Sequence, residues 1–243
     1  MIGKRETRDG FRDDAVRVLF LTRLEHEHLM PNAKTSQRGT PRFELLCGPV
    51  CLDFVNTLDN RPTQPKDLLN RYVDLLYFGQ DTGILTEAQV NHFIERSYFA
   101  PDVAAETLRS AVEMREAMYG VFSAIVNKQP VPRPALAQLN GKIQYAAEHA
   151  RLVQKNGRFV WEFDALTPPD RIFDPVLWPI ARSGADLLAS DQLEFVRACS
   201  SKTCQWLFLD TSKNHRRQWC SMKQCGNRAK ARRFYVRQKR AEG

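Results

Sequence analysis

The sequence has no long apolar run. None of its stretches approaches 18 consecutive apolar residues, so we expect no transmembrane helix. The longest early apolar run, residues 16–21, is interrupted by Arg17 and lacks a small-residue cleavage site, which argues against a signal peptide. We therefore expect a cytoplasmic protein without membrane contact. With 43% hydrophobic residues the chain can still bury a sizeable core, and this excludes wholesale disorder.

The signatures of several enzyme classes are missing as well. The sequence contains no phosphate-binding glycine loop, no HExxH or GxSxG motif, and no Cys–His pair in a catalytic context. An enzyme built on this chain would need perturbed carboxylates in a deep pocket. We therefore expect a binding protein and not an enzyme.

Acidic residues are almost absent near the C-terminus. Residues 197–240 contain 13 basic residues and one acidic residue, Asp210. Residues 43–196 contain 14 basic and 20 acidic residues, so the net charge of +8 conceals a strong asymmetry. A basic segment on a slightly acidic body is typical of proteins that bind a polyanion, most often nucleic acid. The alternative is a basic surface that is only solvated.

Four of the six cysteines lie in this basic segment. Cys199 and Cys204 are separated by four residues, as are Cys220 and Cys225, and 15 residues separate the two pairs. In a reducing compartment such a cluster indicates a metal site and not disulfides. Four thiolates fill a tetrahedral site and leave no position for water or substrate, so we expect one structural Zn²⁺.

The other two cysteines, Cys47 and Cys51, are compatible with metal binding or a redox pair. No further Cys or His lies nearby in the sequence, so core packing is the preferred interpretation. The densest polar cluster of the body follows at Asp53, Asn56 and Arg61. It is either a pocket for a small-molecule effector, with Arg61 binding an anion, or a structural group that hydrogen-bonds buried backbone, which we favour.

Periodicity and turn signals predict an α+β fold dominated by helices. A strand is expected at Phe43–Leu46, and a short helix is possible within residues 11–30. A hairpin is expected around Asn156-Gly157, because apolar alternation flanks this turn dipeptide. Helices are expected over 50–58 and 68–78, from Thr86, from Pro101, from Pro134 to about residue 150, and over 174–189.

The segment between the cysteine pairs predicts a hairpin, with strands at 206–210 and 217–219. A helix is expected to begin near Gly226. A cysteine knuckle, a hairpin and a helix in this order make a treble-clef-like zinc finger. The helix carries basic residues, and four of them lie on one continuous face: Lys230, Arg233, Arg237 and Arg240.

This basic helix is suited to nucleic acid. Its lysines and arginines can contact phosphates, and arginine can also bind guanine edges. Ala231, Phe234 and Tyr235 are expected to pack on the hairpin, while a helix that is only solvated or docked on the acidic body is the alternative. The candidate nucleic-acid-binding residues are Arg228, Lys230, Arg232, Arg233, Arg237 and Arg240. Close to Cys225, Arg228 is also a candidate for hydrogen bonding to the finger itself.

Two stretches resemble known families. The motif Trp219-Cys220-Ser221-Met222 with Cys225-Gly226-Asn227-Arg228 resembles the CGNR zinc finger, over about residues 196–240. Gly48, residues 52–58 and Arg61 resemble the start of the ABATE domain, over about residues 43–190. The resemblance implies bacterial stress-linked transcription regulators in which a treble-clef finger follows an α+β domain.

We therefore divide the chain into an extension and linker at 1–41, partly disordered, an ABATE-like domain at 43–190 and a finger at 196–240. Met30 precedes the polar linker and is a possible translation start. Since the charge changes sign near Val196, we expect body and finger to be separable near residues 189–196.

The leading hypothesis is a zinc-dependent DNA-binding regulator whose body senses a small molecule or forms a homodimer. The alternative is a zinc-finger interaction module that binds RNA or a protein partner.

Overall fold

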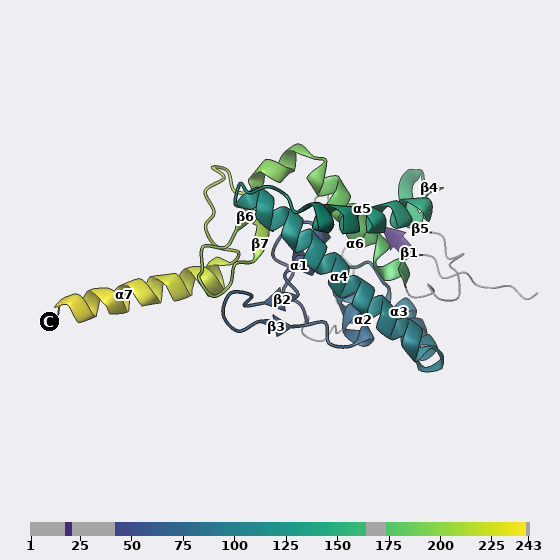
Figure 1. The fold of residues 1–243 in the computed structure, drawn as a ribbon, viewed down its shortest axis with the longest axis horizontal. Helices are drawn as coiled ribbons and strands as arrows, with labels where there is room; N and C mark the ends of the chain where they lie inside the picture. The colour runs from purple at the N-terminus through teal and green to yellow at the C-terminus, as the bar shows by residue number, and fades with distance from the viewer. Residues whose placement is uncertain (1–17, 21–41, 164–173, 242–243) are drawn as a thin grey trace, which may run out of the picture.

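A computed structural model describes residues 18–20, 42–163 and 174–241 (Figure 1). The main helices are α1 (Val50–Val55), α2 (Tyr72–Asp81), α3 (Glu87–Phe99), α4 (Pro101–Val126), α5 (Arg133–Glu148), α6 (Trp178–Leu188) and α7 (Asn227–Ala241). The strands are β1 (Val18–Phe20), β2 (Leu58–Asp59), β3 (Lys66–Asp67), β4 (Ala150–Lys155), β5 (Arg158–Phe163), β6 (Val196–Ala198) and β7 (Leu207–Leu209). None of the helices in these ranges is both long and apolar enough to cross a bilayer.

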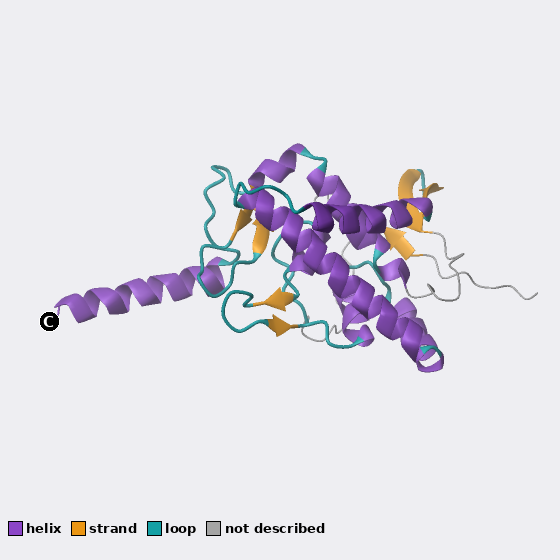
Figure 2. Ribbon diagram, in the orientation of Figure 1, coloured by secondary structure: helices purple, strands orange, loops and turns teal. Residues whose placement is uncertain are grey.

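The predicted α+β class is confirmed, with helices forming most of the body and strands confined to small antiparallel sheets (Figure 2). One sheet has the order β1-β5-β4, and β2-β3 and β6-β7 form two-stranded sheets. The β4–β5 hairpin turns at Asn156 and Gly157, whose φ angles are 50° and 78°. Two successive positive φ angles are what a type I′ turn requires, and this explains the Asn-Gly dipeptide.

The helix starts follow local sequence signals. Thr86 caps α3: its hydroxyl accepts a hydrogen bond from the backbone N–H of Gln89, whose side chain bonds back to Thr86. This reciprocal pair satisfies donors that the first turn of a helix leaves unpaired. Pro101 opens α4 at the position where the missing N–H costs nothing. The helices predicted from Thr86 and Pro101 are therefore confirmed.

Several predicted secondary-structure elements differ from those in the structure. Phe43–Leu46 is irregular and not a strand, and α2 begins at Tyr72 and not at Leu68. Of the possible helix within 11–30, the described part is β1, which pairs with β5; the rest of 1–41, including Met30, lies outside the described residues. Residues 217–219 are not a strand. The partner of β7 is instead β6, which lies before the first cysteine pair in the sequence.

One hydrophobic core joins the body to the finger. Side chains of α1, α4 and α6 form a cluster with those of β6 and β7, and Phe208 in β7 is fully buried. The N–H of Leu209 donates to the carbonyl of Cys47 at 2.8 Å. Gly48 (φ 105°) permits this approach, since a Cβ there would lie 3.1 Å from Cβ of Leu209. This shared core argues against a separable boundary near residues 189–196.

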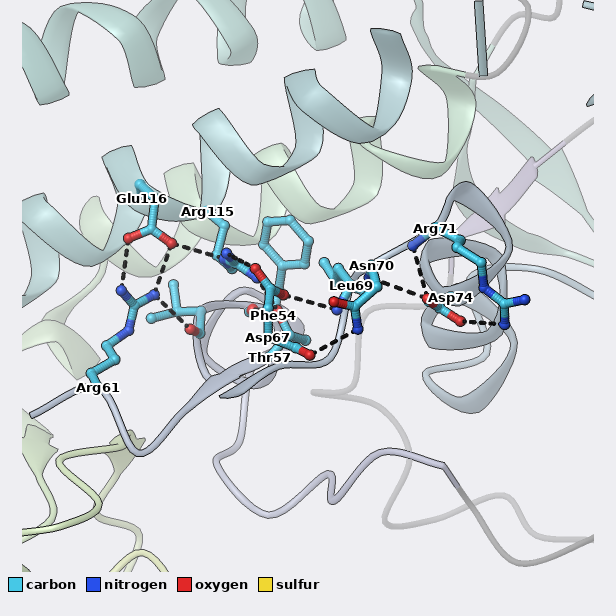
Figure 3. Close-up of polar contacts among 11 residues, drawn as sticks. Phe54, Thr57, Arg61, Asp67, Leu69, Asn70, Arg71, Asp74, Arg115 and Glu116 are labelled. Atoms are coloured by element: carbon cyan, nitrogen blue, oxygen red, sulfur yellow. Dashed lines mark hydrogen bonds and ion pairs between the residues drawn. The ribbon is translucent and has the colours of Figure 1, made fainter. Parts of the chain in front are cut away.

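A line of alternating charges fixes α4 against the β2–β3 segment (Figure 3). The Arg115 guanidinium, 2% exposed, makes two 2.7 Å bonds to the carboxylate of Asp67. Glu116 accepts from Arg115 at 2.9 Å and from Arg61 at 2.7 and 3.1 Å. Such bidentate arginine–carboxylate pairs are the geometry that compensates a buried guanidinium.

The carboxylates in this line are stabilised in their charged forms. Burial alone would raise the pKa of Glu116, but the hydrogen bonds from Arg61 outweigh it, and the pKa is lowered. Burial and the hydrogen bonds from Arg115 compete in the same way at Asp67, whose pKa is also lowered. Both groups therefore stabilise the folded state at neutral pH and lose that contribution as pH falls through their folded pKa values.

We predict that Glu116→Gln removes part of this pH dependence. The stability difference between the wild type and Glu116→Gln is expected to be largest near pH 7, where Glu116 is charged in both folded and unfolded chains. It should shrink below about pH 4, once the carboxylate begins to bind protons. Urea unfolding of both proteins at several pH values measures this difference in the free energy of unfolding. Acid also weakens metal binding to the cysteines, but it does so equally in both proteins, so that effect drops out of the difference. A difference independent of pH would contradict the prediction.

Candidate metal centre

The four cysteines of the basic segment converge on one point. All four Sγ atoms lie within 4.8 Å of one another, and all four residues are buried. Cys199 and Cys204 lie on the loop between β6 and β7, and Cys225 lies in η5 (Met222–Gly226), a short π-helical turn that leads into α7. Folding therefore assembles ligands from two separate loops, as the spacing predicted.

The geometry and chemistry of these donors fit zinc. Thiolates bound at about 2.3 Å to a tetrahedral zinc ion lie about 3.8 Å from one another. The Sγ of Cys220 lies 3.6 Å from that of Cys204 and 3.7 Å from that of Cys225. These residues hold one structural Zn²⁺.

The sulfur atoms cannot all be ionised side by side without a cation. Hydrogen bonds from Cys204 and Cys220 lower the pKa of Cys199. The same contacts with Cys199 raise the pKa of Cys204 and of Cys220. A divalent cation removes this competition, because each thiolate then binds the metal.

Two arginines lie beside the metal centre, and one of them, Arg228, contacts a ligand sulfur. The Arg228 guanidinium donates to Sγ of Cys225 at 3.2 Å, and this hydrogen bond raises the pKa of Arg228. Arg217 donates to the carbonyls of Trp219 and Cys220 and lies 4.7 Å over the ring of Phe208. Arg228 therefore touches the finger itself, as its place beside Cys225 suggested.

Asp210, the one acidic residue of 197–240, organises the loop before the second cysteine pair. Its buried carboxylate accepts from the N–H and hydroxyl of Ser212 at 3.0 and 2.6 Å, and from the N–H of Arg217 at 2.8 Å. Burial would raise its pKa, but the bonds from Ser212 and Arg217 lower it. His215 bonds the carbonyl of Asp210 and stacks on Phe195, so it is not a ligand. This role of Asp210 was not predicted from the sequence, although a single acidic residue among basic ones was a usable signal.

Of the candidate pocket residues, Asn56, directly after α1, joins the finger to the body. The Asn56 side chain accepts from the N–H of Leu207 at 3.0 Å and donates to its carbonyl at 2.8 Å. It also donates to Sγ of Cys47 at 3.1 Å, and Asp53 accepts from the N–H of Cys47 at 2.9 Å. The structural interpretation of Asp53 and Asn56 agrees with this geometry.

Arg61 is also engaged within the protein. Besides its two bonds to Glu116, it donates to the carbonyl of Val55 at 3.2 Å and lies 3.9 Å over the ring of Tyr119. These contacts place Arg61 in the charge line of α4. The two cavities described for this structure are lined by other residues.

Cys47 and Cys51 are core residues. Both are buried free thiols, and burial raises the pKa of Cys51 to about 12 and that of Cys47 well above its usual value. Among the described residues neither joins a cluster of three or more possible metal ligands. Burial also disfavours the thiolate that a redox pair needs. The preferred interpretation of core packing agrees with this arrangement.

The basic helix departs from expectation in one respect. Phe234 and Tyr235 do not pack on the finger: they are 58% and 64% exposed, with ring centroids 6.0 Å apart. Lys230, Arg232, Arg233 and Arg237 are exposed as well, whereas the side chain of Arg240 lies outside the described residues. The predicted packing fails because the hairpin expected over 206–219 does not form and α7 extends away from β6 and β7 (Figure 1).

A closed four-cysteine centre at the base of a basic helix defines a zinc-finger protein. Residues 196–238 match the family model of the CGNR zinc finger, and residues 48–191 match the ABATE model, described as a putative stress-induced transcription regulator. The ABATE match covers more than half of the chain, so the chain belongs to the ABATE family. No curated protein is similar enough to the chain to count as a match.

Cys220→Ser tests the metal centre. We expect this variant to lose zinc, and its thermal unfolding midpoint should fall for the whole chain, because β6 and β7 lie in the shared core. Elemental analysis and circular dichroism of the full chain measure both effects, with Ser221→Ala as the neighbouring control. Full zinc content in Cys220→Ser would contradict the assignment.

Asn56→Ala tests the link between body and finger. Removing the amide leaves the buried N–H and carbonyl of Leu207 without their partner, so the free energy of unfolding should fall by about 2–4 kcal/mol. Asn70→Ala removes an exposed amide that donates to the carbonyl of Asp67, and it should cost less than about 1 kcal/mol. Equal stability losses in the two variants, measured by urea unfolding, would show that Asn56 has no special role.

Proposed function

We propose that this protein is a DNA-binding transcription regulator of the cytoplasm whose α7 contacts nucleic-acid phosphates. The observation that carries the proposal is the position of α7. The helix extends away from the body (Figures 1 and 2), and the described side chains of residues 230–239 are exposed. An isolated basic helix of this kind is free to lie along a polyanion.

The zinc centre gives this helix a fixed base. Cys225 stands two residues before the first residue of α7, and Arg228 in its first turn contacts the Cys225 sulfur. A helix of this length and composition is only marginally stable when unpacked. The metal centre therefore both starts α7 and sets its direction relative to the body.

The charges on α7 suit contact with phosphates. Lys230, Arg233 and Arg237 recur at helical spacing on one face, while Arg232 lies on another. Each phosphate that such a cation neutralises releases counterions and makes binding salt-dependent. The proposal assigns α7 to binding and gives the protein no catalytic role.

The exposed rings favour a second candidate. Phe234 and Tyr235 form an apolar site between basic residues, which is typical of a helix that docks into a partner protein. In this alternative the finger is an interaction module, and aromatic contacts rather than charges supply the binding energy. Variants of the arginines and variants of the two aromatic residues on α7 therefore distinguish the two candidate functions when their binding is compared.

The test is the double variant Arg233→Glu/Arg237→Glu, measured against duplex DNA selected from a random pool. We expect weaker binding to all sequences and a log–log salt slope lower in magnitude by about two, because two phosphate contacts are lost. The matched control is Arg96→Glu/Arg133→Glu, which makes the same charge change at exposed positions of the body. This control should keep both the slope and the affinity.

Zinc content should be unchanged in the double variant, since neither arginine is a ligand. Unchanged salt dependence in this variant would contradict the DNA-binding proposal. If Phe234→Ser/Tyr235→Ser instead abolishes binding to a protein partner while DNA binding is absent, the interaction module is the better account.

A further inference from the structure

A cavity of about 250 Å³ lies among α4, α5 and α6, remote in sequence from the metal centre. Its floor is made by buried residues: Ser110, Met114, Leu177, Trp178 and Ala181. Its rim belongs to α5, and comprises Gln138, Gly141, Lys142 and Tyr145. The cavity therefore combines an apolar floor with a polar rim, the usual composition of a small-molecule site.

Lys142 is the only charged residue of the lining. Its ammonium group donates to the hydroxyl of Ser110 at 2.6 Å, and within the described ranges no carboxylate lies within ion-pair distance of it. A half-buried ammonium group with only a hydroxyl partner retains unused donors and an unbalanced charge. An anion in the cavity would accept hydrogen bonds from the unused donors of Lys142 and would balance its positive charge.

Trp178 adds a donor that has no partner within the described part of the chain. The residue is buried, and its indole N–H has no hydrogen-bond acceptor among the described residues. His149 stacks on the indole with centroids 4.7 Å apart and planes 5° from parallel, which holds the ring in place. A buried polar group without a protein partner calls for an acceptor from a ligand or water.

Gly141 is part of the rim of the cavity. It lies inside α5, where glycine costs about 1 kcal/mol relative to alanine. A Cβ at this position would meet no atom within 4 Å, so close packing does not explain the glycine. Because Gly141 also lines the cavity, a larger side chain at this position has open space beside the rim to fill.

We propose that this cavity binds a small monocarboxylic acid with a compact apolar body. The carboxylate of this acid forms an ion pair with the ammonium group of Lys142, and its apolar part packs against Met114, Leu177 and Trp178. One lysine balances one negative charge, whereas a phosphate group would need more donors than this rim provides. The site differs from the pocket expected at Asp53, Asn56 and Arg61, and it does not depend on the DNA-binding proposal.

The test uses the full chain with three acids, benzoate, phenylacetate and hexanoate, each paired with its uncharged amide. We expect at least one acid to raise the thermal unfolding midpoint and to shift the indole N–H resonance of Trp178, assigned with Trp178→Phe. The corresponding amide should bind at least about tenfold more weakly, because it lacks the charge-assisted bond to Lys142.

Two variant pairs locate the site. Lys142→Met should abolish the acid response, while Lys128→Met, at an exposed position of the α4–α5 loop, should keep it. Gly141→Leu should block the cavity at its rim, while Gly141→Ala should leave it open. The proposal is overturned if no acid produces a shift, if acid and amide bind equally, or if the response survives in both Lys142→Met and Gly141→Leu.

Discussion

The side-chain amide of Asn56 bonds the body of this protein to its finger within their shared core. It bonds both backbone polar groups of Leu207, a residue 151 positions further along the chain. An amide has one donor side and one acceptor side, so it can replace a neighbouring strand at an edge that would otherwise be unpaired. Because the contact is buried, losing it would expose two polar groups to an apolar core.

Zinc and core therefore stabilise the same part of the chain. The β6–β7 sheet carries the first cysteine pair on its connecting loop and buries Leu207 and Phe208 against α1. Trp206 extends the contact by donating its indole N–H to Asp59 at 2.8 Å. The metal centre then fixes the start of α7, so the direction of the basic helix follows from the packing of the body.

Features set by neighbouring residues were predictable from the sequence. The zinc ligands, the Thr86 cap and the Asn156-Gly157 turn each depend on residue types at fixed short spacings. Pairings between distant segments were not predictable, since nothing near Val196 or Asn56 indicates that both meet β7. Phe234 and Tyr235 were misplaced for a related reason: helical periodicity identifies a face, but it does not show whether any element lies opposite.

The most direct test of the shared core is native-state hydrogen exchange of the zinc-loaded full chain in low urea. The amides of Leu207 and Leu209 in β7 and of Met114 and Met118 in α4 should open with the same free energy, because finger strands and body unfold as one unit. Removing zinc should lower the protection of all four amides together. If the β7 amides exchange through a separate opening of lower free energy while α4 stays protected, body and finger are independent units and the account is wrong.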